Sequence, residues 1–313
     1  MIKYLEFEKD IEKIDTKISL LNLDETPDKK KIIKNLDIEK QKLFNKIYSN
    51  LNSWQKVQIA RHPNRPHTFD YIKNIFSNFV SLAGDKKFGE DEAIISGLGK
   101  IDSQSVMIIG TEKGSSMETR IKHNFGMAKP EGYRKSQRLM YLAEKLGLPI
   151  ITFIDTAGAF PGKDAEERGQ SESIASSIAT CLKVKTPILS IIIGEGGSGG
   201  AVAIATANRV TMLEHSIYTV ASPEASASIL WRDSSKASEA ANSMRITAQD
   251  LIEMKIIDGI VSEPIGGAHR NHQKIIKDVE KTIIKNLSEL TKLDRNILVD
   301  NRRNKFLSMG RNI

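Results

Sequence analysis

The chain contains 313 residues, of which 40% are hydrophobic and 27% are charged, as in an ordinary globular protein. This length suffices for one large domain or two modest ones with a substantial core. Basic residues outnumber acidic ones by 46 to 39, which gives a net charge of +7. The densest basic clusters, residues 29–31 and 302–303, are expected on a solvated surface or facing an anionic partner. Only 6% of the residues are aromatic, so the basic and aromatic pattern of a nucleic-acid-binding surface is not indicated.

Cys181 is the only cysteine, which excludes an internal disulfide and a multi-cysteine zinc site and is typical of the reducing cytoplasm. We expect Cys181 to be a small core residue. Glu6 and Glu8 stand where a signal peptide would be apolar. Residues 187–207 carry a single charge, but Glu195 lies near their middle among glycines. This segment therefore indicates a strand, a turn and a helix rather than a membrane span.

Hydrophobic residues at helical spacing predict two helices within residues 1–50, joined by a turn at Thr26-Pro27-Asp28. Residues 54–84 are expected to be helical, with a break at 61–66 where two prolines occur. Short apolar runs then predict strands at 93–98, 106–109, 150–154, 188–193, 210–213 and 256–261.

Helices are expected between these strands. One begins at Pro130 and ends at Gly147. The next has acidic residues in its first turn, from Asp164 onward, and an inward face formed by Ile174, Ile178, Cys181 and Leu182. A last helix over about 272–293 leads into a polar basic tail. This alternation predicts an α/β core. We expect an N-terminal helical arm (1–53), a catalytic domain (54–293) and a C-terminal tail (294–313).

The sequence Gly194-Glu195-Gly196-Gly197-Ser198-Gly199-Gly200 fits three different motifs. It matches the dinucleotide-binding pattern, but it follows several strands rather than the first one. It also matches a nucleophile elbow centred on Ser198, for which Asp233 or Asp258 and His269 would have to complete a triad. So many glycines are unusual in such an elbow, and a separate oxyanion motif is not visible in the sequence.

The third interpretation concerns the backbone of residues 194–200. A buried strand enters the glycines and a helix of small residues follows, so the first helical amides are unpaired and lie at the positive end of the helix dipole. Two such amides can form an oxyanion hole. Ser198 is then expected to be the helix N-cap. A purely structural turn is the alternative.

Eight short motifs occur along the chain. They are Arg61-His62-Pro63-x-Arg65-Pro66, Asn124-Phe125-Gly126-Met127, Pro130-Glu131-Gly132-Tyr133-Arg134-Lys135, Phe153-Ile154-Asp155-Thr156, Ala165-Glu166-Glu167-Arg168-Gly169-Gln170-Ser171-Glu172, Gly194 to Ala201, Ser228-Ile229-Leu230-Trp231 and Glu263-Pro264-x-Gly266-Gly267-Ala268-His269-Arg270. They occur in the order found in the α subunit of bacterial acetyl-CoA carboxylase carboxyltransferase, which the chain resembles over essentially its whole length.

The resemblance implies a crotonase-like fold, related to ClpP and crotonase, in which β-β-α units form a spiral core. It also implies transfer of a carboxyl group from carboxybiotin, carried on the biotin carboxyl carrier protein, to acetyl-CoA. The product is malonyl-CoA, in the first committed step of fatty acid biosynthesis. A β subunit carrying a zinc ribbon would complete an α2β2 heterotetramer, and ATP would be consumed by the separate biotin carboxylase. No metal is expected in the present chain.

Site residues follow from the same resemblance. The amides of Gly199 and Gly200 are expected to hold the biotin-side oxyanion. The biotin pocket is expected to include Asp155, Gly158, Ala159, Phe160, Gly197, Ser198, Glu224 and Ala225. Arg120, Lys122 and Arg134 are candidates for contacts with CoA phosphates or with the β subunit.

Three positions depart from the family pattern. Family members usually have proline at position 157 and tyrosine at position 160, and commonly glycine at position 225, where this chain has Ala157, Phe160 and Ala225. A left-handed backbone would be costly at Ala225. We expect His62 and His269 to have structural or interface roles. The alternatives to the family's reaction are another crotonase-like acyl-CoA enzyme, a Clp-type peptidase acting alone, and an inert scaffold.

Overall fold

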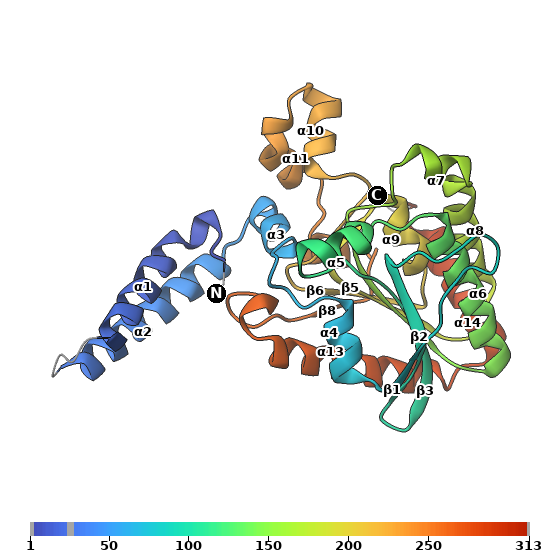
Figure 1. Ribbon diagram of the computed structural model, residues 1–313, viewed down its shortest axis with the longest axis horizontal. Helices are drawn as coiled ribbons and strands as arrows, with labels where there is room; N and C mark the ends of the chain where they lie inside the picture. The colour runs from blue at the N-terminus through green and yellow to red at the C-terminus, as the bar shows by residue number, and fades with distance from the viewer. Residues whose placement is uncertain (1–2, 24–27, 312–313) are drawn as a thin grey trace.

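A computed structural model describes residues 3–23 and 28–311 of the chain (Figure 1). A helical hairpin, α1 (Lys9–Leu23) and α2 (Lys29–Tyr48), extends away from the body of the molecule (Figure 1). Both helices were predicted, whereas Thr26 and Pro27 of the predicted turn lie outside the described residues. At the base of the hairpin the buried Glu8 accepts a hydrogen bond of 2.8 Å from Arg270 Nη2, which attaches the arm to the body.

The body is built on one eight-stranded sheet with the order β1-β2-β3-β4-β5-β6-β8, and β7 pairs with β5. The strands are β1 (Ser77–Ser81), β2 (Ile94–Ile101), β3 (Gln104–Thr111), β4 (Ile150–Thr156), β5 (Ile188–Gly197), β6 (Arg209–Leu213), β7 (Ile217–Thr219) and β8 (Gly259–Val261). The pairs β1–β2 and β2–β3 are antiparallel, and every later pair is parallel. The carboxyl ends of β3, β4 and β5 therefore lie at one edge of the sheet.

All six predicted strands are present, although β8 is confined to the second half of the predicted range 256–261. The structure adds two strands. β1 lies inside the stretch predicted to be helical, and its side chains are exposed except for the half-buried Phe79, so no alternation of burial marked it. β7 has only three residues. Pairing with a neighbour, rather than a local pattern, forms these two strands.

Helices cover both faces of the sheet. One hydrophobic cluster joins the sheet to α6 (Pro130–Leu146), α8 (Gln170–Lys183) and α9 (Ser198–Ala205), and another joins it to α4 (Thr68–Ile75) and α13 (His272–Leu290). The remaining helices are α3 (Ser53–Ala60), α5 (Met117–Lys122), α7 (Lys163–Glu167), α10 (Pro223–Trp231), α11 (Ala237–Ser243), α12 (Ala248–Glu253) and α14 (Arg295–Ser308). α6 begins at Pro130, and Gly147 ends it in the left-handed conformation, as predicted.

The predicted inward face of α8 is only partly correct. Cys181 is buried, but Ile174, Ile178 and Leu182 are only partly buried. The other buried positions are Gln170 and the small polar residues Ser173, Ser177 and Thr180. The hydroxyl of Ser177 donates a 2.7 Å hydrogen bond to the Ala203 carbonyl of α9, so the two helices pack closely through small side chains.

The segment predicted to be a polar tail instead forms helix α14, which packs against the body. Arg302, expected at the surface, is fully buried. Its Nη2 donates to the Thr186 carbonyl and to Asn208 Oδ1, each at 2.7 Å. The predicted domain boundaries remain a prediction. Within residues 3–23 and 28–311, no helix is both long and apolar enough to cross a bilayer.

Candidate functional site

The glycine-rich turn lies where β5 passes directly into α9. Gly197 has an extended backbone with φ −91° and ψ 120°, and the helix begins at the next residue. Gly199 and Gly200 therefore occupy the first turn, where helical amides have no partner within the helix. Gly199 is half-buried and Gly200 is buried. The predicted strand, glycine turn and helix of small residues are thus present.

The loop that follows β4 packs directly against this turn. A Cβ atom at Gly197 would lie 2.2 Å from the Ala157 oxygen, and one at Gly200 would lie 2.5 Å from the Gly158 carbonyl carbon. Only glycine allows two backbones to approach this closely. Gly158 and Ala159 consequently lie against Gly200 in the first turn of α9, and their role in a pocket stays a prediction.

Ser198 does not have the capping role expected from the sequence. Gly197 occupies the cap position, and among the described residues no side chain caps the first turn of α9 by a hydrogen bond. Ser198 is exposed and has φ 50°, a left-handed conformation that costs a non-glycine residue about 1–2 kcal/mol. This conformation occurs where β5 passes directly into α9.

The triad required by a Ser198 nucleophile is not assembled. Asp258 accepts hydrogen bonds from Lys305 and from the Val210 amide at the other end of the sheet. Asp233 accepts from the Ser235 amide in a short turn after α10. The His269 ring stacks on the His62 ring, with centroids 3.8 Å apart. The geometry therefore opposes the nucleophile-elbow interpretation.

His62 and His269 are both buried, which fits structural roles. His62 Nε2 donates to the Lys3 carbonyl at 2.7 Å, and His62 Nδ1 accepts from the Asn64 amide. Burial, together with the neighbouring His62 and Arg65, lowers the pKa of His269 to about 2. His269 is therefore a neutral packing residue at physiological pH.

Asp155, predicted in the wall of the pocket, lies near the end of β4 and is held by charged and polar partners. Its side chain is 5% exposed and Oδ1 accepts from Lys113 Nζ at 2.8 Å and from the Glu195 amide at 2.9 Å. Burial alone would raise the pKa of Asp155, but the Lys113 ammonium and the His67 ring outweigh it and hold the pKa well below its usual range. The carboxylate is therefore ionised and enclosed.

A chain of ion pairs, with acidic and basic side chains in alternation, leads from Asp155 to Glu224 in α10. Lys113 Nζ also donates to Glu195 Oε2 at 2.7 Å, and Arg61 Nε donates to Glu195 Oε1 at 2.6 Å. The other arm of Arg61 donates to Glu224 Oε1 at 2.5 Å. Glu224 is thus occupied by an ion pair, although its side chain stays 39% exposed.

A cavity of about 230 Å³ lies beside this chain of ion pairs. It is lined by Ala60, Arg61, His62, Pro63, His67, Lys113, Arg120, Phe125, Asp155, Ala157 and Glu195. Because Ala157 and Glu195 border both the cavity and the glycine-rich turn, the cavity adjoins the region in front of α9. Arg120 is the one CoA candidate that faces it, and its Nε donates to the Gly114 carbonyl at 3.3 Å.

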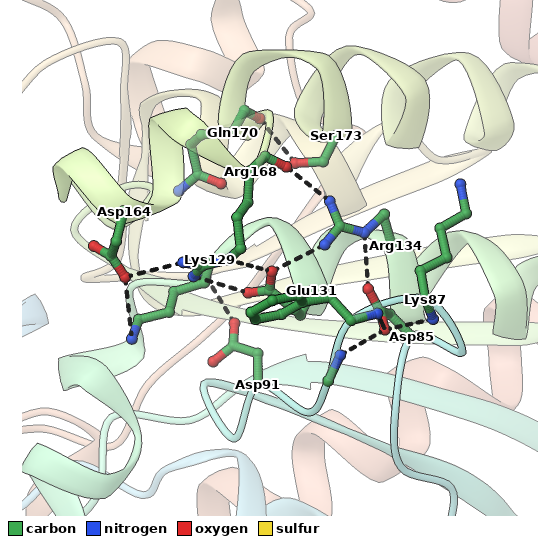
Figure 2. A network of polar contacts seen from close by, with 12 residues as sticks. Asp85, Lys87, Asp91, Lys129, Glu131, Arg134, Asp164, Arg168, Gln170 and Ser173 are labelled. Atoms are coloured by element: carbon green, nitrogen blue, oxygen red, sulfur yellow. Dashed lines mark hydrogen bonds and ion pairs between the residues drawn. The ribbon is translucent and has the colours of Figure 1, made fainter.

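The other two CoA candidates lie elsewhere. Lys122 is exposed and pairs with Glu92 at 2.8 Å. Arg134 is largely buried and lies at the centre of a polar network (Figure 2), where it donates to Asp85 Oδ2 at 2.8 Å and to Glu131 Oε1 at 2.9 Å. Its remaining nitrogen donates to the Arg168 carbonyl. Internal partners therefore engage all three nitrogens of Arg134, and its contact with CoA or a subunit stays a prediction.

Two of the three positions that depart from the family pattern, Ala225 and Phe160, have defined contacts. Ala225 lies in the first turn of α10, and its amide donates to Ser222 Oγ at 3.1 Å. That amide is used by the helix cap and is not free for a ligand, and no left-handed backbone is required there. Phe160 is half-buried; its amide donates to the Ala128 carbonyl at 3.0 Å and its ring lies 4.9 Å from Lys129 Nζ.

Sequence reasoning missed Lys113 and His67. Lys113 follows β3 by two residues, so its place at the carboxyl end of a parallel strand was the only available signal. His67 is buried beside Asp155, with Nδ1 3.6 Å from Oδ2. Arg61 and Glu195 belonged to recognised motifs, but their pairing joins segments far apart in the chain.

The fold is shared with solved structures of carboxyl-transferring enzymes. The chain aligns with transcarboxylase 12S with a TM-score of 0.60 at 15% identity, over 73% of this chain and 42% of that one. It aligns with the beta subunit of P. aeruginosa geranyl-CoA carboxylase with a TM-score of 0.57 at 15% identity, over 78% of this chain and 46% of that one. At this identity the likeness establishes the fold, which confirms the predicted α/β, crotonase-like class.

Sequence comparison establishes the family. The family model described as acetyl co-enzyme A carboxylase carboxyltransferase-like matches residues 4–310. The acetyl-coenzyme A carboxylase carboxyl transferase subunit alpha of Zymomonas mobilis is 54% identical over 312 residues, covering 99% of this chain and all of the relative. That of Agrobacterium fabrum is 53% identical over 317 residues and covers both chains fully. The chain belongs to the family of acetyl-CoA carboxylase carboxyltransferase α subunits, which are transferases.

Proposed function

We propose that the amides of Gly199 and Gly200 stabilise the oxyanion of biotin while a carboxyl group passes from carboxybiotin to acetyl-CoA, giving malonyl-CoA. The observation that carries the proposal is the position of these amides. They lie in the first turn of α9 directly after β5, and the loop after β4 packs against them. The amides are therefore held in place before any ligand arrives.

The chemistry requires such donors. Release of the carboxyl group from carboxybiotin leaves negative charge on the ureido oxygen, and deprotonation of the acetyl methyl group puts charge on the thioester oxygen. Fixed amides stabilise charge of this kind without reorganisation, and each donor contributes about 2.7–4 kcal/mol in a transition state. The biotin nitrogen can serve as the base, so no catalytic histidine is needed from this chain.

The proposed pocket includes fewer of the predicted residues as ligand contacts than the sequence suggested. Gly158, Ala159 and Phe160 form its wall, and Gly197 and Ser198 form its floor. Ion pairs hold the carboxylates of Asp155 and Glu224, and the amide of Ala225 serves the cap of α10. Arg120 remains a candidate for a CoA phosphate because it borders the adjoining cavity.

We also propose that the chain works with a carboxyltransferase β subunit in an α2β2 assembly, together with the biotin carboxyl carrier protein and biotin carboxylase in the cytoplasm. Zinc would be held by the β subunit. Helix α10 supports a subunit contact, because Ile229 and Leu230 are 76% and 67% exposed on an element that projects from the body (Figure 1). Exposed apolar patches of this kind are typical of interaction sites.

The test is co-expression with the β subunit, mass measurement of the complex and an assay of malonyl-CoA formation from carboxybiotin and acetyl-CoA. Gly199→Pro deletes one amide, whereas Gly199→Ala keeps it and adds a Cβ whose nearest neighbour is Ile174 Cγ2 at 3.4 Å. We expect the alanine variant to assemble and turn over, and the proline variant to assemble with at least about 100-fold lower kcat. Equal turnover of the two variants would reject the oxyanion role, and activity of the isolated chain on enoyl-CoA or peptides would reject the proposed reaction.

A further inference from the structure

Three charged side chains meet where three neighbouring strands end. Lys113 follows β3, Asp155 is the penultimate residue of β4, and Glu195 lies near the end of β5. Lys113 Nζ is 2.8 Å from Asp155 Oδ1 and 2.7 Å from Glu195 Oε2. All three side chains are largely buried, with 17%, 5% and 10% of their surfaces exposed, respectively. The ammonium thus bridges two enclosed carboxylates.

This bridge spans an irregularity in the sheet. Ile154 pairs with Ile192, but Thr156 pairs with Gly196, so two steps along β4 match four steps along β5 (156 − 154 against 196 − 192). The surplus residues of β5 leave the regular β4–β5 ladder, and the Glu195 amide donates instead to the Asp155 side chain. Such bulges re-aim the residues that follow them. Here the residues that follow are those of the glycine-rich turn.

Gly194 shows how closely the bulge fits around the carboxylate. A Cβ atom at this position would lie 2.4 Å from Asp155 Oδ1. The bulge therefore packs directly on the Asp155 carboxylate and is hydrogen-bonded to it. Two neighbouring buried carboxylates repel one another strongly without a cation, because the interior screens charge poorly. Lys113 is the cation that contacts both.

We infer that Lys113 is a positioning residue for carboxyl transfer, which holds the bulge of β5 so that the Gly199 and Gly200 amides face the reacting oxygen. The inference rests on the proposed function of these amides. Lys113 acts through Asp155 and Glu195 and contributes to the geometry of the transition state more than to substrate binding. Misplacement of a catalytic donor by about 1 Å can lower a rate about 100-fold.

The position of Lys113 allows a test by chemical rescue. Its side chain borders the cavity of about 230 Å³, so Lys113→Ala leaves a space that a small alkylammonium ion can reach from the cavity. Ethylammonium would restore the cation between the two carboxylates. A purely structural role in folding would not respond to an added amine once the complex is formed.

The control is Lys305→Ala. Lys305 is similarly buried, with 16% of its side chain exposed, and pairs with Asp258 at 2.8 Å. It also donates to the carbonyl of Asn208, just before β6, at the end of the sheet opposite the glycine-rich turn. The control therefore removes a comparable lysine and ion pair without touching the bulge.

The experiment uses the complex with the β subunit. For Lys113→Ala we expect kcat to fall about 100-fold and KM for acetyl-CoA to change less than about threefold. Ethylammonium should restore at least about one tenth of the lost rate in a saturable manner, and Lys113→Arg should retain more activity than Lys113→Ala. Lys305→Ala should keep wild-type kcat with or without ethylammonium. Wild-type kcat in Lys113→Ala, or a loss that ethylammonium does not change in an assembled complex, would overturn the inference.

Amide hydrogen exchange of residues 194–200 separates this inference from the proposed function. Exchange there should rise in Lys113→Ala and return toward wild type with ethylammonium, whatever reaction the complex performs. If the wild-type complex forms no malonyl-CoA but the exchange changes as expected, the proposed function fails and the role of Lys113 in holding the turn stands. Unchanged exchange in Lys113→Ala would refute that role.

Discussion

Arg65 and Glu263 form a bidentate ion pair in the interior of the protein. Arg65 Nη1 donates to Glu263 Oε2 and Arg65 Nη2 donates to Glu263 Oε1, each at 2.8 Å. The side chains are 2% and 0% exposed. The pair is completed by hydrogen bonds from Arg65 to the Ile193 carbonyl and from the amides of His215 and Ala268 to Glu263. It joins the segment after α3 to β5 and to the segment after β8.

Glu263→Gln should destabilise the protein strongly, because it leaves the Arg65 guanidinium buried without a counterion. Breaking a buried pair in this way costs about 3–5 kcal/mol in the free energy of unfolding. The matched control is Glu253→Gln, which breaks an Arg–Glu pair with Arg245 whose members are 49% and 73% exposed. Such a surface pair contributes about 0–1 kcal/mol. Chemical denaturation of the wild type and the two variants measures both losses of unfolding free energy. Equal losses would contradict the expectation that the buried pair contributes more than the exposed pair.

The same pair predicts a pH dependence. Burial alone would raise the pKa of Glu263, but Arg65 outweighs it and lowers the pKa from 4.5 to about 2. The folded state therefore binds this proton less readily than the unfolded state. The stabilisation is fully present above pH 4.5 and is lost as the pH falls from there to about 2. The free energy of unfolding, measured across this pH range, should decline more steeply for the wild type than for Glu263→Gln. Parallel declines in the two proteins would show that ionisation of Glu263 does not contribute to stability.

Gly200→Ala should impair the site by a steric effect alone. Its Cβ would meet the backbone of Gly158 and Ala159 at 2.5–2.7 Å, and backbone atoms cannot move aside easily. We expect a loss of about 1–3 kcal/mol in stability, as for other overpacked positions, together with a fall in kcat. Gly199→Ala is the control, since its nearest contact of 3.4 Å is with a side chain. Thermal unfolding and malonyl-CoA formation distinguish the two variants.

Ser198→Gly and Ser198→Ala separate conformation from chemistry at the start of α9. With φ 50°, Ser198 is in a region that glycine adopts without strain, so Ser198→Gly should raise stability by up to about 1 kcal/mol. Ser198→Ala should retain most of the carboxyl transfer activity. Near-total loss in the alanine variant would instead indicate a serine nucleophile.

The sequence alone determined the family, the class of fold and the place of the glycine-rich turn. Local patterns were sufficient for this because apolar runs mark the buried strands, and because Pro130 and Gly147 mark the two ends of α6. The order of eight motifs, which needs no structure, identified the carboxyltransferase family. The single buried Cys181 was likewise predictable from its position in α8.

The tertiary structure alone decided which charges meet. Asp155 and Glu224 looked like ligand contacts in the sequence, but Lys113 and Arg61 engage them from other parts of the chain. Arg302 looked exposed in a basic stretch, yet it is buried on backbone carbonyls. Ion pairs of this kind depend on distances between strand ends, and these are set by sheet order and by the bulge in β5. No local pattern encodes them, because the partners lie far apart in the chain, 163 residues for Arg61 and Glu224 and 198 for Arg65 and Glu263.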